Sequence, residues 1–210
     1  MASLAQLIQS GDVEGVREHL AENPNATVEE APSPLLLAVY HGQAAVAEAI
    51  RHTRPDLTLH EAAALGDVHQ LAASLAKDPG GVKEFSTDGF SPLGYAAFFN
   101  HPSAAKLLLK AGADANVVSQ NGLGVSPLHS ALAGGHKELA RMLFEAGGDV
   151  SAPSKAGWTP AHYAAHKGDL ETARYLRARG AKLDAVNADG HTAAQIAHAE
   201  GRTELAELLS

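Results

Sequence analysis

The fold is decided by the stretch Gly157-Trp-Thr-Pro-Ala-His-Tyr-Ala-Ala165, which continues through His-Lys to Gly168. A hydroxyl residue followed by proline is typical of a helix start. The hydroxyl caps a free backbone N–H, and Pro fits the first helical position. Glycine about eight residues later is typical of a helix end, because it adopts the left-handed conformation that reverses the chain. The stretch therefore predicts a short helix that ends in a tight turn.

The same pattern recurs along the whole chain. Ser-Pro or Thr-Pro pairs begin it at positions 33, 91, 126 and 159. A second helix-like run follows each turn, and Asp12, Asp67 or Asp169 begins that run in three of them. A period in the low thirties built from two helices predicts a solenoid of about seven helix pairs. The turn position is filled by Gly11, Gly42, Gly66, Asn100, Gly135, Gly168 and Gly201, at intervals of 31, 24, 34, 35, 33 and 33 residues.

Polar, turn-rich segments separate the helix pairs. They contain glycines such as Gly122, Gly157 and Gly190, and we expect each to form a finger between two pairs. The 24-residue interval leaves no room for a full finger between the second and third repeats. Two extra residues lie around Leu123-Gly124, so we expect the finger there to be longer than the others.

These residues resemble the ankyrin repeat family. The segments Asp88-Gly-Phe-Ser-Pro-Leu, Ser126-Pro-Leu-His-Ser-Ala and Gly157-Trp-Thr-Pro-Ala-His look like its signature, and Lys110-Ala-Gly-Ala-Asp-Ala-Asn116 looks like its glycine-alanine-aspartate ending. The resemblance implies an all-α solenoid in which a β-turn finger precedes two antiparallel helices. It also implies that fingers and first helices line the concave side. His60, His129 and His162 are expected at the signature histidine, as struts between adjacent turns.

We expect one continuous domain over residues 1–210, because each repeat contacts only its neighbours. Residues 1–32 form an N-terminal capping repeat and residues 189–210 a C-terminal capping repeat in this division. The internal repeats span 33–59, 60–87, 88–120, 121–155 and 156–188.

Composition narrows the classes of function. The net charge is −8 and the pI about 5.8, whereas nucleic-acid binding requires a positive surface, so we expect no nucleic-acid partner. No apolar run approaches the length of a membrane span, and no basic segment followed by an apolar one opens the chain. We therefore expect a monomeric cytoplasmic protein that contacts no membrane. The absence of Cys excludes disulfides and thiolate chemistry.

The sequence offers no convincing catalytic or metal site. Twelve histidines are present, and His162 and His166 have the spacing of two ligands on one helix, but a third ligand is missing. The run Asn121-Gly-Leu-Gly124 lacks the preceding buried strand of a phosphate loop. No nucleophile elbow or carboxylate pair stands out. We therefore expect no catalytic residue, no metal and no cofactor, and we do not expect an enzyme.

Residues that the repeat skeleton does not need are the candidates for binding. They stand before each recurring turn and near each finger tip, where they should face the groove. Five of the ten aromatic residues fall there, and rigid aromatic side chains are common in binding hot spots. Ala133 and Gly134 would leave a shallow pocket between Phe99 and Trp158. The candidate partner-binding residues are Tyr40, His41, Leu65, Phe90, Phe98, Phe99, Asn121, Leu123, Lys155, Trp158, His166, Lys167 and His191.

Three functions remain open at this point. The first is a non-catalytic module that binds a protein or peptide in its concave groove. The second is a regulatory or inhibitory subunit of an enzyme. The third is a metal-dependent hydrolase that uses the histidines. Family resemblance favours the first but names no partner, since one fold serves many tasks.

Overall fold

The computed structural model describes residues 2–29, 31–54 and 56–210. Within these residues the chain forms seven antiparallel helix pairs and one short 3-10 helix, η1 (Pro79–Lys83). This confirms the all-α solenoid predicted from the repeat. The pairs are α1 (Leu4–Ser10) with α2 (Val13–Glu22), α3 (Pro34–Tyr40) with α4 (Ala44–Thr53), α5 (Leu59–Leu65) with α6 (Val68–Lys77), α7 (Pro92–Phe98) with α8 (Pro102–Lys110), α9 (Pro127–Gly134) with α10 (Lys137–Glu145), α11 (Pro160–Lys167) with α12 (Leu170–Ala178), and α13 (Ala193–Ala199) with α14 (Thr203–Leu208).

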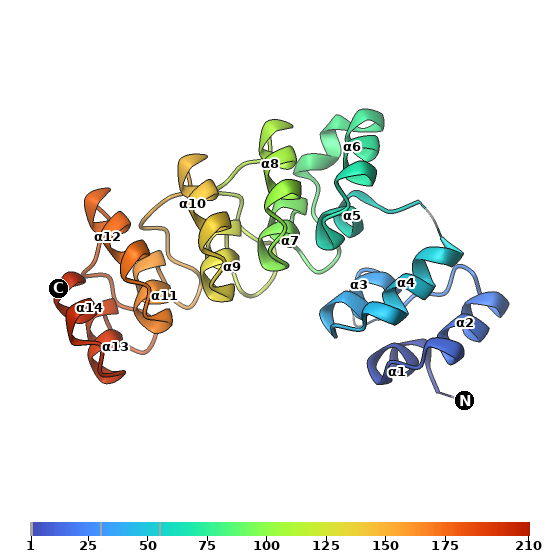
Figure 1. Cartoon of the computed structure of the whole chain (residues 1–210), viewed down its shortest axis with the longest axis horizontal. Coiled ribbons are helices and arrows are strands. Elements are labelled where there is room, and N and C mark those ends of the chain that lie inside the picture. Colours follow the sequence, from blue (N-terminus) through green and yellow to red (C-terminus); the bar gives the residue numbers. More distant parts are fainter. Residues whose placement is uncertain (1, 30, 55) are drawn as a thin grey trace.

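The pairs follow one another in an arch with the termini at opposite ends (Figure 1). The first helix of most pairs lies on the inner side of the arch and the second on the outer side. The row turns sharply between the α3–α4 pair and the α5–α6 pair. Only residues 54–58 connect these two pairs, so the predicted absence of a finger there is confirmed.

Local sequence accounts for the helix boundaries. Ser33, Ser91 and Ser126 each accept a backbone N–H of the helix that follows, and Asp12, Asp67 and Asp169 do so at second helices. All seven predicted turn residues have a positive φ, and Asn100, at 59°, is the one non-glycine residue with a positive φ in the described chain. Asn tolerates this conformation better than most residues.

The core is made of small and branched apolar side chains. Ala residues fill the first helices, and Leu71, Leu108, Leu139, Leu143 and Leu176 from second helices are fully buried. The short Ala side chains allow neighbouring pairs to approach closely. Burial of a Leu side chain contributes roughly 1.5–3 kcal/mol, so the neighbour contacts supply the stability that no single pair has.

Polar side chains link successive pairs at a recurrent place, the start of each second helix. Gln43 donates to the carbonyl of Gln9 at 3.1 Å, and Arg202 donates to that of Ala165 at 2.6 Å. The imidazole nitrogen Nε2 of His101 lies 2.9 Å from the carbonyl of Ala64. These carbonyls belong to the last turn of the first helix in the preceding pair, where the regular helical hydrogen bonds run out.

Two of the three Asp-capped second helices, α6 and α12, use a different link. Asp67 receives Arg51 of the preceding pair at 3.0 Å, and Asp169 receives Lys137 at 3.0 Å. Asp169 is buried, and its pKa is lowered below its usual range because the Lys137 ammonium and Thr172 bind the carboxylate, which outweighs the opposing effect of burial. Each Asp therefore caps its own helix and ties it to the previous repeat.

One expectation about the third repeat is wrong. Helix α5 is capped by Thr58, whose hydroxyl accepts the N–H of Glu61, so Glu61 and not His60 stands at the signature position. Its carboxylate is fully buried, accepts the Ser33 hydroxyl at 2.6 Å and the Thr58 N–H at 2.9 Å, and pairs with Arg54. The third repeat thus begins at Thr58 rather than at 60, and a carboxylate replaces the imidazole strut.

Candidate functional site

The fingers position the side chains that reach the inner side of the arch. Three of them close with a hydrogen bond between residues four apart, as from Ser154 N to Trp158 O at 2.9 Å. The finger between α8 and α9 closes between Ser119 and Val125 at 2.9 Å, six residues apart. The two extra residues predicted around Leu123 are confirmed, and Leu123 is 58% exposed.

Beside this long finger lies a pocket of about 320 Å³, which we call the aromatic pocket. Its residues come from four elements: the end of α3, the finger before α7, helix α7 itself, and the long finger. They are Tyr40, Asp88, Phe90, Tyr95, Phe98, Asn121 and Leu123. Five of the seven belong to the candidate set drawn from the sequence.

The aromatic rings of the pocket form one contact cluster. Tyr40 lies 6.2 Å from Phe98 in an edge-to-face arrangement and 5.5 Å from Phe99. Phe99 stacks on Tyr95 at 6.4 Å, and Phe90 lies 5.8 Å from Tyr95. Phe98 and Phe99, expected to act together, are divided in role. Phe98 is 49% exposed at the pocket, whereas Phe99 is half-buried against the core.

Asp88 is the polar centre of the pocket. Its carboxylate accepts the hydroxyl of Tyr40 at 2.6 Å and that of Tyr95 at 2.8 Å, and it also accepts the Ser86 hydroxyl. Tyr40 belongs to the second repeat and Asp88 to the finger of the fourth, so this contact crosses the whole third repeat. The sharp turn of the arch beside α3 permits it.

Asn121 has a structural role in the pocket wall. Its side-chain nitrogen donates to the carbonyl of Asp88 at 3.1 Å, and its side-chain oxygen accepts the Ser119 hydroxyl and the Leu123 N–H at 2.9 and 3.0 Å. The amide therefore holds the long finger against the finger before it. Leu123 is presented to the pocket by this arrangement.

Four of the remaining candidates, Trp158, His166, Lys167 and His191, form a second group near the other end of the arch. The half-buried Trp158 ring lies 5.1 Å from Tyr163 and 5.8 Å from His166. His166 lies 2.9 Å from Glu200, and Lys167 is exposed nearby on the same helix. His191 exposes its side chain, while its carbonyl receives the imidazole of the buried residue His162.

Three other candidates line neither group, although Lys155 donates its N–H to the carbonyl of Leu123 at 3.2 Å and its ammonium to that of Asn121 at 3.4 Å, and so braces the long finger. His41 is exposed at the end of α3, and Leu65 is half-buried against the core. Lys155 is exposed, and its aliphatic stem covers Gly124. The shallow pocket expected at Ala133 and Gly134 is not formed as predicted, because the imidazole of His136 occupies the space above Gly134 and lies 3.3 Å from the carbonyl of Phe98.

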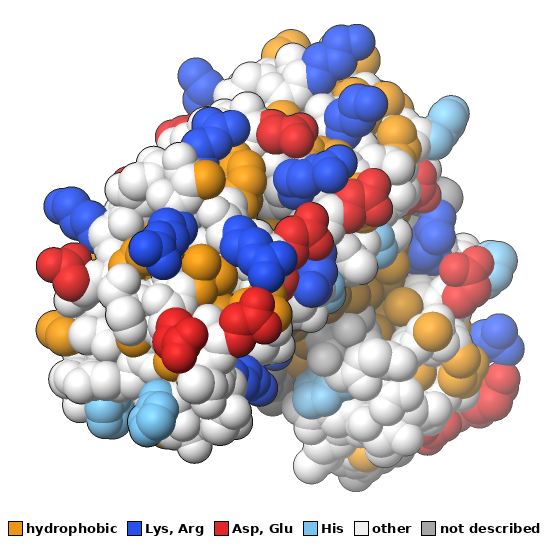
Figure 2. Space-filling view, turned by 60° about the vertical axis from the view of Figure 1, so that its left-hand side comes forward, with side chains coloured by type: hydrophobic (Ala, Val, Ile, Leu, Met, Phe, Trp, Pro, Cys, Tyr) orange, Lys and Arg blue, Asp and Glu red, His pale blue; other side chains and the backbone are white. Residues whose placement is uncertain are grey.

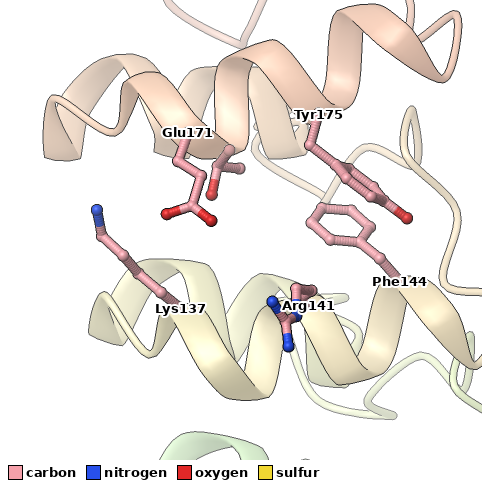
Figure 3. A pocket seen from close by; sticks show the side chains of 6 residues that line it. Lys137, Arg141, Phe144, Glu171 and Tyr175 are labelled. Carbon is pink, nitrogen blue, oxygen red and sulfur yellow. The ribbon is translucent and has the colours of Figure 1, made fainter.

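The outer side of the arch carries a much smaller pocket, of about 70 Å³. Lys137, Arg141 and Phe144 reach it from α10, and Glu171 and Tyr175 from α12 (Figure 3). The rings of Phe144 and Tyr175 pack at 4.8 Å. This space is a seam between second helices. On the face shown in Figure 2, Lys and Arg side chains are interspersed with Asp and Glu rather than gathered into one basic surface.

His129 and His162 serve as struts between repeats. Nδ1 of His129 accepts the Ser126 N–H at 3.0 Å, so Nε2 carries the proton and donates to the carbonyl of Ala152 at 2.8 Å. His162 repeats this geometry between Thr159 and His191. Burial lowers the pKa of both imidazoles. Among the residues that the structure describes, no group of three or more His, Asp or Glu side chains is placed to hold a metal ion.

The stacked pairs of short helices and the turn fingers between them place this protein among the helical repeat proteins. Family models described as ankyrin repeats match residues 59–154 in one case and residues 134–176 and 161–209 in another. The chain belongs to the ankyrin repeat family. Ankyrin repeats generally mediate protein–protein interactions, and the family is typically non-catalytic. None of the helices described is both long and apolar enough to cross a membrane.

Sequence reasoning missed two residues of the aromatic pocket, Asp88 and Tyr95. Asp88 stands within the segment that resembles the family signature, and Tyr95 lies on the buried side of α7, so neither falls at the positions before the turns and near the finger tips from which the candidates were drawn. A signal for Tyr95 was present, since a Tyr hydroxyl within an Ala-rich helix needs a polar partner when buried.

Proposed function

We propose that this chain is a non-catalytic module that binds a polypeptide partner on the inner side of its arch, at the aromatic pocket. The observation that carries the proposal is the exposed apolar rim of this pocket, where Phe98, Leu123 and Tyr40 are 49%, 58% and 36% exposed. Exposed apolar clusters of this kind usually mark interaction sites. Aromatic anchors surrounded by fixed neighbours are typical of binding hot spots.

Rigidity supports the same proposal. Asn121 fixes the long finger, and Asp88 ties the second repeat to the fourth, so the walls of the pocket are held before any partner arrives. A surface that is already ordered loses little conformational freedom on association. The Trp158 group lies on the later repeats and would extend the contact along the arch.

A double variant tests the proposal. Phe98→Ala with Leu123→Ala removes both exposed side chains from the rim, and Val186→Ala serves as the matched control because Val186 is 57% exposed on another finger. A random peptide library would be selected on the wild-type chain, and the peptides recovered would be measured against all three proteins.

Hot-spot truncations typically cost more than 2 kcal/mol, so we expect the double variant to lose at least about thirtyfold in affinity and the control to lose almost none. Peptides that bind the folded double variant as tightly as the wild type would disprove the placement of the site. Capture from a lysate of the source cells, with the same three proteins, then identifies the natural partner. Recovery at fixed stoichiometry would indicate a permanent enzyme subunit.

A further inference from the structure

The aromatic pocket contains a single charged group, the Asp88 carboxylate. Among the residues that the structure describes, no Lys, Arg or His forms an ion pair with it. His60 lies close enough to interact with Asp88 over a longer distance, but burial lowers the pKa of its imidazole, so it supplies no fixed positive charge. The carboxylate is therefore balanced by neutral donors alone.

Those donors are phenols and a serine hydroxyl. Burial raises the pKa of Tyr40 and of Tyr95 above the ordinary range, so both phenols keep their protons and continue to donate to Asp88. Hydroxyl donors stabilise a carboxylate but do not cancel its charge. The other lining groups are aromatic rings, the Leu123 side chain and an amide already in use, so Asp88 carries the one charge among the lining residues. The nearby Lys155 ammonium is engaged by the carbonyl of Asn121, at 3.4 Å, and does not line the pocket.

The aromatic rings of the pocket also favour a positively charged ligand. The face of an aromatic ring is electron-rich and attracts cations within about 6 Å of its centroid. Tyr40, Tyr95 and Phe98 surround the space beside Asp88, where exclusion of water strengthens electrostatic attraction. A cation placed there would meet ring faces and a carboxylate together.

The charge of the surrounding chain is consistent with a cationic ligand. Residues 1–125, which supply the whole pocket, contain fourteen acidic residues against seven basic ones. Residues 126–210 contain ten against nine. Nearly all of the net charge of −8 thus lies in the part of the chain that forms the pocket. A negative field of this kind raises the local concentration of basic segments.

We infer that the aromatic pocket receives a cationic side chain, Arg or Lys, of the partner polypeptide. The inference rests on the proposed function and specifies its ligand. The aliphatic stem of such a side chain packs against Leu123 and Phe98 at the rim, while its charged head reaches Asp88 between the rings of Tyr40 and Tyr95. A volume of about 320 Å³ accommodates one long side chain.

The test uses three small probes: the N-acetyl methylamides of arginine and lysine, which are cationic, and that of norleucine, which is neutral. Each is titrated into the full chain while the aromatic NMR signals of Tyr40 and Phe98 are followed, with Trp158 as the remote reference. We expect saturable shifts at Tyr40 and Phe98 with at least one cationic probe, at an affinity at least about fivefold above that of norleucine. Added salt should weaken the binding of the cationic probe and leave the binding of norleucine unchanged.

Asp88→Asn provides the matched variant, because it removes the charge and keeps the shape. It should remove most of the difference in affinity between the cationic probes and norleucine, since only the ring faces then favour the cation. Equal binding of norleucine and the cationic probes to the wild type, no saturable shift with either cationic probe, or salt-independent cationic binding would each overturn the inference, whatever the variant does. These results leave the proposed function standing, since that function fails only if selected peptides still bind the Phe98→Ala, Leu123→Ala chain.

Discussion

Replacing Glu61 by Ala should weaken the junction between the second and third repeats more than any surface change would. The Glu61 carboxylate is fully buried and replaces both the missing finger and the histidine strut at this point of the arch. Its loss leaves the Ser33 hydroxyl and the Thr58 N–H without their partner, while Arg54, 41% exposed on its side chain, can turn to water.

The magnitude follows from these contacts. The capping interaction with Thr58 is worth about 1 kcal/mol, and a hydrogen bond to a charged group roughly 1.5–3 kcal/mol. The partly exposed Arg54 pair adds about 0–1 kcal/mol. We therefore expect a loss of about 2.5–5 kcal/mol. In a repeat array such a loss falls on one interface, so the α1–α4 block should unfold before the rest.

Urea unfolding followed by two signals measures this effect. Far-ultraviolet circular dichroism reports all helices, whereas fluorescence of Trp158, the single Trp of the chain, reports the later repeats. In Glu61→Ala the dichroism midpoint should fall well below the fluorescence midpoint. Gln195→Ala is the control, because Gln195 has the same capping position in α13 but is exposed. Coincident midpoints in Glu61→Ala, with a loss no larger than in the control, would refute the role given to the carboxylate.

Three further predictions concern the struts and fingers. Burial lowers the pKa values of His129 and His162, so as the pH falls the unfolded chain takes up protons before the folded one does. The stabilisation from these two imidazoles is therefore complete above the unfolded pKa of about 6.5 and is lost as the pH falls below it. The urea midpoint should decline from neutral to mildly acidic pH, and less steeply in the double variant His129→Gln, His162→Gln; parallel slopes would contradict this. Gly157→Ala should lower the stability of the fold more than Gly190→Ala does. Both glycines have a positive φ, which adds about 1 kcal/mol of backbone strain to either variant, but of the two only Gly157 would place a Cβ against backbone, 2.9 Å from Asn187 Cα. A lower thermal midpoint for Gly157→Ala than for Gly190→Ala is the expected result. Deleting Gly122 and Leu123 should change stability by only about 1 kcal/mol and still abolish binding of the selected peptides; retained binding would show that the long finger is not part of the site.

Local sequence predicted the repeat skeleton because each of its signals acts within a few residues. Hydroxyl-proline starts, Asp caps and glycine turns depend on the backbone nearby, and the structure confirms them at Ser33, Asp12 and Gly11, for example. The signature position of the third repeat was wrongly predicted at His60. The sequence nearby already indicates Glu61, since Thr58 followed three residues later by Glu61 is itself a capping signal.

The contents of the aromatic pocket were less predictable. Tyr40 and Asp88 are 48 residues apart and belong to repeats that are not neighbours. A nearest-neighbour reading of a solenoid places them apart. Their contact depends on how sharply the arch turns between the α3–α4 pair and the α5–α6 pair, which follows from the packing of whole helix pairs. The pocket expected at Gly134 failed for a related reason, because His136 on the next helix folds back over it.

The tie between Tyr40 and Asp88 limits how this array can be lengthened. Repeat proteins are commonly extended by inserting further copies, since each copy contacts only the two beside it. A copy inserted between α4 and α7 would carry the phenol out of reach of its carboxylate and dismantle the pocket. Growth is therefore compatible with the binding surface only outside this segment, and variation in array length should be confined to the later repeats or the ends.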